Sequence, residues 1–343
     1  MNTPSIMRAL RLESPGAPLQ LVEIPVPQPA RGEVLVRIVA AGINPLDTKI
    51  RAGKAAHAAQ DAPAILGIDM VGVVEAIGAE AGRFNAGDAV YGMTGGVGGT
   101  AGSLAEFAAV DARLLAPAPA RLPLADCAAI PLGFITAWEG LVDRAALRKG
   151  QSLLVHGGAG GVGSMAVQLG VARGATVVAT GSPAQESTIT AMGATFVDYR
   201  ETSIEAIVSM HTGGIGFDVV YDTLGGATLD ASFKAVRRYG GHVVSSLGWG
   251  THSLAPLSFR AGTYSGVFTL LPLLSGEGRE QHGKIMAEAT RLVDAGHLRP
   301  VLSQQRFDLA DGNAALDLVE SGRSAGKVIV DVSAADALPR PRS

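Results

Sequence analysis

The chain contains very little cysteine, few aromatic side chains and almost no excess of either charge. Its 343 residues include one cysteine, Cys127, which excludes an intrachain disulfide and a zinc site built of several thiolates. Lys and Arg number 28 and Asp and Glu 31, giving a net charge of −3. Binding to nucleic acid by charge alone, or to an acidic membrane surface, would need a basic excess, so we expect neither partner. Aromatics make up 5% of the chain, which does not suggest a base-stacking surface.

Long hydrophobic runs are also missing. The longest apolar stretch, residues 64–78, is interrupted by Asp69 and Glu75 and is too short to span a bilayer. The first twelve residues contain Arg8 and Arg11 and no continuous apolar segment of the length that a signal peptide requires. Together with the single thiol, these features predict a cytoplasmic protein in a reducing compartment, without a membrane span.

Hydrophobic residues and glycine are abundant. The chain is 47% hydrophobic and 17% charged, so it can bury a sizeable core. Its 45 glycines are about 13% of the residues (45 of 343), against a usual share of about 7%. The length suits one large domain or two of ordinary size.

The residues before about 124 and after about 150 show two different patterns. The first region has short apolar segments separated by proline and glycine, and it predicts an all-β unit. Its expected strands lie at 8–12, 19–24, 33–43, 70–78 and 88–93.

After residue 150, predicted strands and helices alternate. The strands are expected at 152–156, 176–180, 195–198, 218–222 and 242–246, and the helices at 162–173, 186–192, 203–211 and 227–238. This alternation is typical of βαβ units and of a parallel sheet covered on both faces. Further elements are predicted at 265–270 (a sixth strand), 281–296 and 311–322 (amphipathic helices) and 327–332 (a last strand).

A glycine-rich turn lies between the first of these strands and its helix. Gly158, Gly160 and Gly163 have the spacing G-x-G-x-x-G, with Ala159, Gly161 and Val162 between them. In a dinucleotide site the three glycines permit a tight turn, close approach of the backbone to pyrophosphate, and close helix–strand packing. The helix amino terminus offers N–H groups to the phosphates. A lone motif of this kind is weak, but here a strand precedes it and a helix follows.

The end of the second strand bears on which dinucleotide is bound. NAD-binding proteins usually place a carboxylate there to bind the ribose 2′-hydroxyl. Here Gly181 and Ser182 occupy this region, and Glu186 is the first carboxylate, so a 2′-phosphate is permitted and NADPH is favoured. The groups available for the phosphate are Ser182, Gln185, Tyr199 and Arg200.

Several segments together resemble the medium-chain dehydrogenase/reductase superfamily, and within it the zinc-independent quinone oxidoreductase branch that includes zeta-crystallin. The resemblance extends from about residue 8 to residue 332. It is carried by PVPQPARGEVLVRIVAAGINPLDTKIRAG (25–53), GIDMVGVVEAIG (67–78), GDAVYG (87–92), GQSLLVHGGAGGVGSMAVQL (150–169), GFDVVYDTLGG (216–226), YGGHVVSSLG (239–248) and AGKVIVDV (325–332).

The resemblance implies an α/β protein of two domains. Residues 1–124 together with 267–343 would form a GroES-like β domain that carries catalytic groups. Residues 125–266 would form an inserted Rossmann domain, a doubly wound parallel sheet that binds NADP. The active site would lie in the cleft between the domains, and two chains would form a homodimer through the edge strands of their Rossmann sheets.

Departures from zinc-dependent relatives point to the chemistry. Those relatives carry a metal-binding cysteine where this chain has Asn44, and Gly-His-Glu where it has residues 67–69, Gly-Ile-Asp. The seven histidines show no close-spaced ligand pair. Without a Lewis acid to stabilise an alkoxide, hydride transfer from NADPH to an already electrophilic acceptor is favoured. We therefore expect a zinc-free oxidoreductase whose small-molecule acceptor is a quinone or a similar conjugated carbonyl.

The resemblance also assigns residues. Asn44, Asp47 and Thr136 would be catalytic, and Asn44 and Thr136 would also contact the cofactor. Backbone segments near the nicotinamide would be formed by Ser246, Leu247, Gly248, Val267, Phe268 and Thr269. Lys327 would bind the cofactor, and His57 and Trp249 would line the substrate pocket. Six of these residues have a purely structural alternative: a turn before Pro45 for Asn44, loop charge for Asp47, helix interior for Thr136, core packing for Leu247 and Phe268, and solvation for Lys327.

Two other functions remain open. One is NADPH-dependent reduction of the C=C bond of an enone, enal or enoyl thioester. Residues 46–63 contain no tyrosine that could act as proton donor, so an enoyl thioester is a less expected substrate than an enone or enal. The other is a non-catalytic dinucleotide-binding or RNA-binding relative, for which the net charge gives no electrostatic support.

Overall fold

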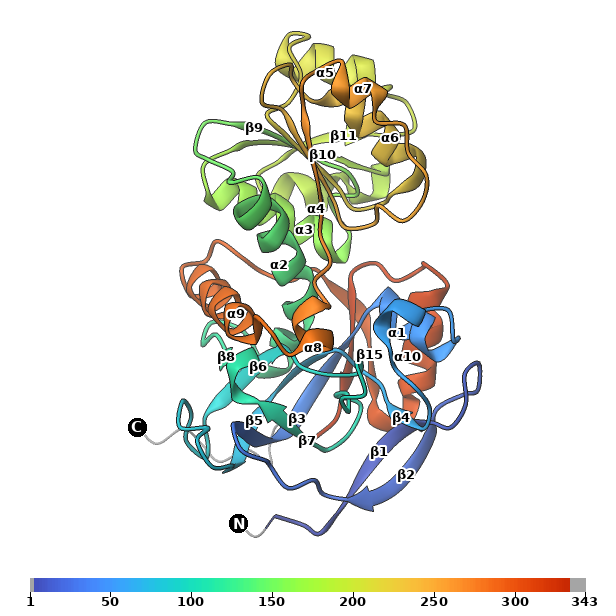
Figure 1. The fold of residues 1–343 in the computed structure, drawn as a ribbon, viewed down its shortest axis with the longest axis vertical. Helices are drawn as coiled ribbons and strands as arrows, with labels where there is room; N and C mark the ends of the chain where they lie inside the picture. Colours follow the sequence, from blue (N-terminus) through green and yellow to red (C-terminus); the bar gives the residue numbers. More distant parts are fainter. Residues whose placement is uncertain (1–2, 334–343) are drawn as a thin grey trace. The chain divides into compact units, whose positions relative to one another are not determined.

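The computed structural model describes residues 3–333, which divide into two compact units. The first unit contains the residues up to Leu132 and those from Leu270 onward, and the second unit contains Gly133–Thr269 (Figure 1). The sequence had placed these boundaries at 124/125 and 266/267. The 3₁₀ helix η3 (Leu124–Ala129) packs on β3 (Glu33–Ile43) and β5 (Asp69–Ile77), so the first unit extends beyond residue 124.

No helix within residues 3–333 is both long enough and apolar enough to cross a membrane.

The first unit is built on a seven-stranded sheet that joins segments from both ends of the chain. Its order is β15-β16-β3-β5-β6-β8, and β7 also pairs with β3. The remaining bounds are β6 (Ala89–Met93), β7 (Phe107–Asp111), β8 (Ala116–Pro117), β15 (Leu302–Asp308) and β16 (Lys327–Asp331). Because β16 pairs antiparallel with β3, the carboxy-terminal segment completes the GroES-like fold, as the resemblance implied. A smaller sheet has the order β2 (Gln20–Pro25), β1 (Ile6–Leu12), β4 (Ala64–Ile65).

The prediction of an all-β first region was wrong because a helix, α1 (Pro45–Arg51), follows β3. Proline at its first position already has a helical φ, and Asp47 in its first turn interacts favourably with the helix dipole. Seven residues are too few to show a helical period. The other helical segments of this unit are η1 (Ala56–Ala58), η2 (Ala112–Leu114), α8 (Leu271–Ser275), α9 (Arg279–Asp294), η6 (Leu309–Asp311) and α10 (Gly312–Glu320).

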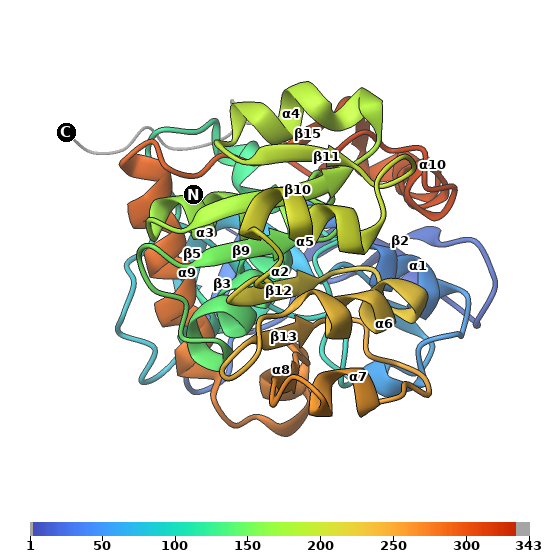
Figure 2. The same ribbon diagram turned by 90° about the horizontal axis from the view of Figure 1, so that it is seen from above.

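The second unit contains the predicted parallel sheet, in the order β11-β10-β9-β12-β13-β14 (Figure 2). The bounds are β9 (Ser152–Val155), β10 (Thr176–Gly181), β11 (Thr195–Asp198), β12 (Val219–Asp222), β13 (His242–Ser245) and β14 (Thr263–Gly266). This is the doubly wound Rossmann order, which reverses direction between β9 and β12. The sixth strand was predicted too late in the chain. In the ladder Gly266 pairs with Ser245, the last residue of β13, so β14 ends where its partner ends.

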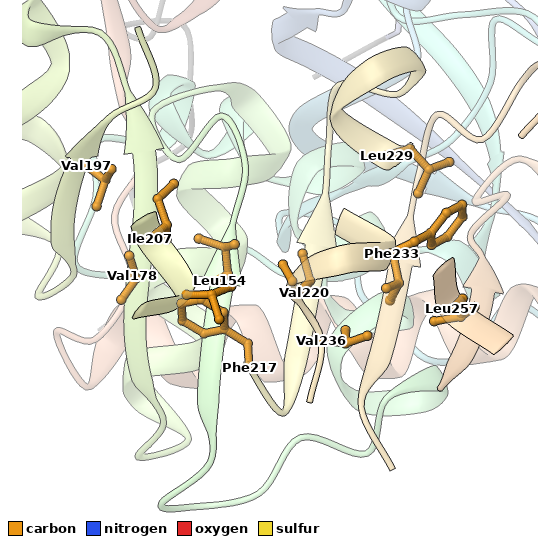
Figure 3. Packing of buried hydrophobic residues seen from close by; sticks show 13 residues of the cluster. Leu154, Val178, Val197, Ile207, Phe217, Val220, Leu229, Phe233, Val236 and Leu257 are labelled. Carbon is orange, nitrogen blue, oxygen red and sulfur yellow. The ribbon is translucent and has the colours of Figure 1, made fainter. Parts of the chain in front are cut away.

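Helices cover both faces of this sheet. On one face Leu154, Val178 and Val220 pack with residues of α5 (Ile204–Thr212) and α6 (Gly226–Ala235) (Figure 3). On the other face α3 (Gly161–Ala172) lies against β9 and β10. The remaining elements are α2 (Pro131–Trp138), the π-helix η4 (Glu139–Arg144), η5 (Pro183–Gln185), α4 (Glu186–Ala191) and α7 (Ala255–Ser258). Ligands of such sheets collect at the carboxyl ends of the strands near the reversal.

Candidate functional site

The loop of residues 157–163, here called the phosphate loop, connects β9 to α3 at the reversal point. Gly157 has a φ of +71°, so the tight turn lies one residue before the first glycine of the motif. A Cβ on Gly163 would lie 2.0 Å from the Gly157 carbonyl oxygen, and one on Gly158 would lie 2.6 Å from Ala179 Cβ. A Cβ on Gly161 would have nothing within 4 Å. The loop therefore needs glycine for its own packing at Gly163, whereas Gly161 borders open space.

The N–H groups at the start of α3 make this loop a candidate anion site. α3 begins at Gly161, and the first N–H groups of a helix have no partner within it. Gly160 and Gly161 are exposed, and Ala159 and Val162 are half-buried. A helix amino terminus with accessible N–H groups fits a pyrophosphate.

Two hydroxyl groups, from the buried Thr180 and the half-buried Thr223, support the start of the phosphate loop. The Thr180 hydroxyl accepts a hydrogen bond from the Gly157 N–H (3.2 Å), and the Thr223 hydroxyl donates to the His156 carbonyl (2.7 Å). Burial lowers the pKa of His156 to about 4, so its ring is neutral at physiological pH. Sequence reasoning saw these three residues only as strand and turn positions.

The carboxyl ends of β10 and β11 bring together the residues predicted for the 2′-phosphate. Gly181 pairs with Asp198 in the ladder, which places Tyr199 and Arg200 beside the segment 182–185. Gln185 Oε1 accepts a hydrogen bond from the Ser182 N–H (2.9 Å). The Arg200 guanidinium lies over the exposed Tyr199 ring, 5.7 Å from its centroid.

The ends of β11 and β10 also contain a carboxylate, Asp198, and a tightly packed glycine, Gly181. Asp198 was not foreseen as part of the site, and its Oδ1 accepts the Arg200 N–H (3.0 Å). A Cβ on Gly181 would lie 2.6 Å from Ile189 Cδ1, so glycine is required there for packing.

A buried aspartate positions the predicted nicotinamide segment 246–248. Asp222, at the end of β12, is fully buried and accepts hydrogen bonds from the Gly225 N–H (3.0 Å) and the Ser245 hydroxyl (2.7 Å). Ser245 Oγ in turn accepts the Leu247 N–H (3.1 Å). A Cβ on Gly248 would lie 2.1 Å from the Tyr264 hydroxyl. Sequence reasoning identified the segment, including Ser246, but missed its anchor, Asp222.

The second predicted nicotinamide segment, 267–269, follows β14. Val267 donates its N–H to the Ser245 carbonyl (2.9 Å), and the hydroxyls of Thr136 and Thr269 lie 3.0 Å apart. The Phe268 ring makes an edge contact with Trp249, whose side chain is 58% exposed. These contacts bring four predicted residues together in two pairs: Thr136 with Thr269, and Trp249 with Phe268.

In the first unit, strand register assembles a second polar group. Gly42 of β3 pairs with Asp69 of β5 on one side and with Ile329 of β16 on the other. Asn44 and Lys327 therefore end up beside Asp69. We call Asn44, Asp69 and Lys327 the Lys327 cluster.

The contacts within the Lys327 cluster are short and almost completely buried. Lys327 Nζ forms an ion pair with Asp69 Oδ2 at 2.8 Å and also donates to Asn44 Oδ1. The Asn44 amide donates to Asp69 Oδ2 (3.0 Å), and Asp69 Oδ1 accepts the Leu132 N–H (2.9 Å). The Lys327 side chain is 8% exposed and Asp69 is fully buried.

Asp47 borders this cluster. Its Oδ2 accepts the Asn44 N–H at 2.8 Å, and its Oδ1 is buried without a hydrogen-bond partner among residues 3–333. Burial raises the pKa of Asp47 to about 7, and the negative charge of Asp69 adds to that effect, while the Asn44 N–H and Lys327 oppose it. The structure thus brings Asn44, Asp47 and Lys327 together. His57, predicted for the substrate pocket, lies exposed in η1.

Within the described part of the chain, His, Cys, Asp and Glu side chains form no group of three or more that could hold a metal ion. The Lys327 cluster contains one carboxylate, one amide and one ammonium. An ammonium ion-paired to the carboxylate does not suit a divalent cation, so these residues do not fit a zinc site.

Two protein families match segments of the chain. Residues 30–120 match the family described as the alcohol dehydrogenase GroES-like domain, and residues 192–330 match the family described as zinc-binding dehydrogenase.

Curated relatives match about nine-tenths of the chain. It is 33% identical to the 2-methylene-furan-3-one reductase of Solanum lycopersicum and 32% identical to the chloroplastic NADPH-dependent alkenal/one oxidoreductase of Arabidopsis thaliana. Each match covers 90% of this chain and 74% of the relative. The chain is also 34% identical, over 90% of its length, to the spectinabilin polyketide synthase system protein NorB of Streptomyces orinoci, but it spans only 14% of that protein.

Solved structures share the fold along nearly the whole chain. An alcohol dehydrogenase superfamily protein from Novosphingobium aromaticivorans has 52% identity and a TM-score of 0.93, covering 95% of this chain and 100% of that one. The quinone oxidoreductase of Pseudomonas syringae pv. Tomato DC3000 has 26% identity and a TM-score of 0.82, covering 95% and 99%. The chain therefore belongs to the medium-chain dehydrogenase/reductase superfamily, the oxidoreductases that include the alcohol dehydrogenases.

Proposed function

We propose that this oxidoreductase uses NADPH to reduce a quinone or a similar conjugated carbonyl compound, and that it does so without zinc. The observation that carries the proposal is the Lys327–Asp69 ion pair. It places an ammonium beside Asn44, the position at which zinc-dependent members of the superfamily carry a metal ligand. An acceptor that is already electrophilic needs no strong Lewis acid, which suits such a site.

The choice of NADPH is supported by the ends of β10 and β11. Gln185, Tyr199 and Arg200 lie around the loop in which NAD-binding proteins place a carboxylate. The guanidinium of Arg200 is exposed and can pair with a 2′-phosphate. The cofactor printed in the name of the Arabidopsis relative, NADPH, points in the same direction.

Two acceptor classes are supported by different relatives. The names of the tomato and Arabidopsis proteins indicate reduction of conjugated alkenals and alkenones, and they share 32–33% identity with this chain. The Pseudomonas structure carries the name quinone oxidoreductase at 26% identity. Both classes are conjugated carbonyls that accept a hydride at carbon or oxygen, so reduction of the C=C bond of an enone or enal is the second candidate.

In the proposed reaction the chain binds and orients, and the bound cofactor supplies a hydride. The phosphate loop would bind the pyrophosphate, and the backbone of residues 246–248 and 267–269 would orient the nicotinamide ring. Thr136 is held by its contact with Thr269 and by the Tyr221 hydroxyl, which donates to the Thr136 carbonyl (2.7 Å). The Lys327 cluster would polarise the carbonyl of the acceptor.

The test is a matrix of initial rates with NADPH or NADH against 1,4-benzoquinone, an enone, an enal and an enoyl thioester. We expect turnover of quinone or enone, with kcat/KM higher for NADPH than for NADH. Zinc content would be measured on the same sample, and activity should survive chelation. Turnover of alcohols alone, or activity lost with a stoichiometric metal, would contradict the proposal. Tight, salt-sensitive RNA binding without turnover would favour a binding function instead.

We also propose that the protein is a homodimer formed through the second unit. β14 is an edge strand, and an unpaired edge can pair with a second copy. Phe259, close to that edge in sequence, is 83% exposed. Sedimentation at micromolar concentration should show a dimer, and a monomer alone would refute this assembly.

A further inference from the structure

The register in which β16 pairs with β3 buries the Lys327 ammonium. Lys327 opens β16, which pairs with β3 so that Val328 lies opposite Ile43. Gly42 is needed to make room, because a Cβ there would lie 3.0 Å from Lys327 Cε and 2.1 Å from the Ala128 carbonyl oxygen. A buried ammonium without an acid partner would be costly, and Asp69 supplies that partner.

The ammonium also fixes which way the Asn44 amide faces. All hydrogens on Lys327 Nζ are donors, so the Asn44 atom that meets it must be the oxygen, Oδ1. The Asn44 NH₂ group then faces Asp69 Oδ2 at 3.0 Å and the Gly42 carbonyl at 3.4 Å. Both amide hydrogens therefore have acceptors within the protein, and Asn44 is poorly placed to donate to a ligand.

Lys327 is the member of the cluster that has an N–H group left over for a ligand. A protonated lysine has three N–H groups, and here Asn44 and Asp69 accept two of them. The third has no acceptor within residues 3–333. The side chain keeps 8% of its surface accessible, whereas the carboxylate of Asp69 is fully buried.

We propose that Lys327 is a catalytic residue, whose third N–H donates a hydrogen bond to the carbonyl oxygen of the acceptor and stabilises the negative charge that forms there. Asn44 and Asp69 are positioning residues, because they hold the ammonium through its other two N–H groups. This inference rests on the proposed function and replaces a direct contact between Asn44 and the acceptor.

The electrons and protons balance as follows. A C–H bond forms between the hydride and the carbon conjugated to the carbonyl, and the displaced π electrons move to the carbonyl oxygen as an enolate. With a quinone the hydride adds to one carbonyl oxygen, so an O–H bond forms, the ring π electrons shift to the other carbonyl oxygen, and the product is a hydroquinone monoanion. The cofactor is left oxidised by two electrons, Lys327 keeps its proton, and water supplies the proton that completes the product. A preorganised donor at such an oxygen is typically worth a factor of about 10²–10³ in kcat.

The decisive variant is Lys327→Met combined with Asp69→Asn. It removes the ammonium without leaving a buried unpaired carboxylate, so it should fold even if the single substitution prevents folding. We expect kcat for an enone to fall about 100-fold to 1000-fold, while the Kd for NADPH changes less than about twofold. Lys284→Met, on the exposed side of α9, is the matched control and should retain wild-type kcat.

A comparison of acceptors separates catalysis from structural support. A hydroquinone monoanion is a weaker base than an enolate and needs less stabilisation, so the loss with 1,4-benzoquinone should be under about tenfold. An equal loss for both acceptors would indicate a structural role and overturn the inference, as would wild-type kcat in the double variant. A wild-type protein that reduces neither acceptor would instead overturn the proposed function.

Binding of an oxyanion provides a readout that does not depend on turnover. 4-Nitrophenolate imitates the charged oxygen of the enolate, and its binding can be followed by absorbance in the presence of NADP⁺. Wild type should bind it at least tenfold more tightly than the double variant. Equal affinity, including no binding by either protein, would overturn the assignment of Lys327.

Discussion

The two units build their polar sites in different ways. The phosphate loop of the second unit is a continuous run of seven residues that offers backbone N–H groups. The Lys327 cluster of the first unit consists of side chains from three segments, and Lys327 and Asp69 are 258 positions apart in the sequence. Backbone N–H groups do not titrate, whereas the cluster and its neighbour Asp47 depend on charge. Substitutions in the phosphate loop should therefore act through shape, and those in the Lys327 cluster and at Asp47 through charge.

The largest effect is expected from Lys327→Met alone. It leaves Asp69 buried without its cation, and removal of one partner of a buried pair typically costs about 3–5 kcal/mol. Denaturant unfolding should show this loss. Adding Asp69→Asn should recover most of it, and the difference between single and double variants measures the role of charge. If the single variant were as stable as wild type, the ion pair would not stabilise the first unit.

The next effect concerns the pH dependence of stability. Burial raises the pKa of Asp47 from 3.8 to about 7, so between these values the folded chain keeps a proton that the unfolded chain releases. The stability that this group contributes is complete below about pH 4 and is lost as pH rises through 7. One pKa unit corresponds to about 1.4 kcal/mol, so wild type should lose as much as about 4 kcal/mol relative to Asp47→Asn between pH 4 and pH 8.

Unfolding free energies of both proteins across that range provide the measurement for Asp47. Any constant cost of burying the new amide cancels in the comparison. Parallel pH profiles for the two proteins would show that Asp47 does not titrate in this window.

In the second unit, Gly163→Ala should destabilise by about 1–3 kcal/mol, because its Cβ would lie 2.0 Å from the Gly157 carbonyl oxygen. NADPH affinity should fall with it, measured by fluorescence titration. Gly161→Ala is the matched control for stability only, since its Cβ meets open space in the protein itself. The difference in unfolding free energy between the two variants should be the same at pH 6 and pH 8. If the two alanines had equal effects, the packing argument would be wrong.

The smallest effect is expected at the exposed end of β11. Arg200→Ala should weaken NADPH binding about tenfold at low salt and leave NADH binding unchanged, because only NADPH carries the 2′-phosphate. Arg238→Ala, also exposed in the second unit, is the control. Equal weakening of both cofactors would exclude a contact between Arg200 and the 2′-phosphate.

The same contrast explains what the sequence could predict. Strand β11 has the predicted bounds, and the other strands of the second unit as far as β13 lie within one residue of prediction, because buried parallel strands are continuous apolar runs. The glycine spacing likewise predicted the turn between β9 and α3, because it too is a local pattern. The helix α1 was not predicted, because its seven residues are too few to show the hydrophobic period of a helix.

The residues that the sequence missed depend on contacts distant along the chain. Asp69 was noted only as a departure from zinc-dependent relatives, and its partners follow from the pairing of β3 with β5 and β16. Asp222 was predicted as the end of a strand. The hydrogen bond that it accepts from the Gly225 N–H is local, but the one from the Ser245 hydroxyl requires the neighbouring strand β13 to be in place. Sheet register, which no local pattern determines, is the missing information in both cases.

The pairing of β16 with β3 has a consequence for biosynthesis. A ribosome makes β3 before the second unit and β16 after it, so a nascent chain that has reached residue 270 contains the whole second unit but lacks the strand that pairs with residues 40–43 of β3. Until β16 is made, Asp69 lacks the Lys327 ammonium, and residues 40–43 of β3 have an unpaired edge that is open to other chains. The second unit can fold while translation continues, whereas completion of the first must wait for its last strand.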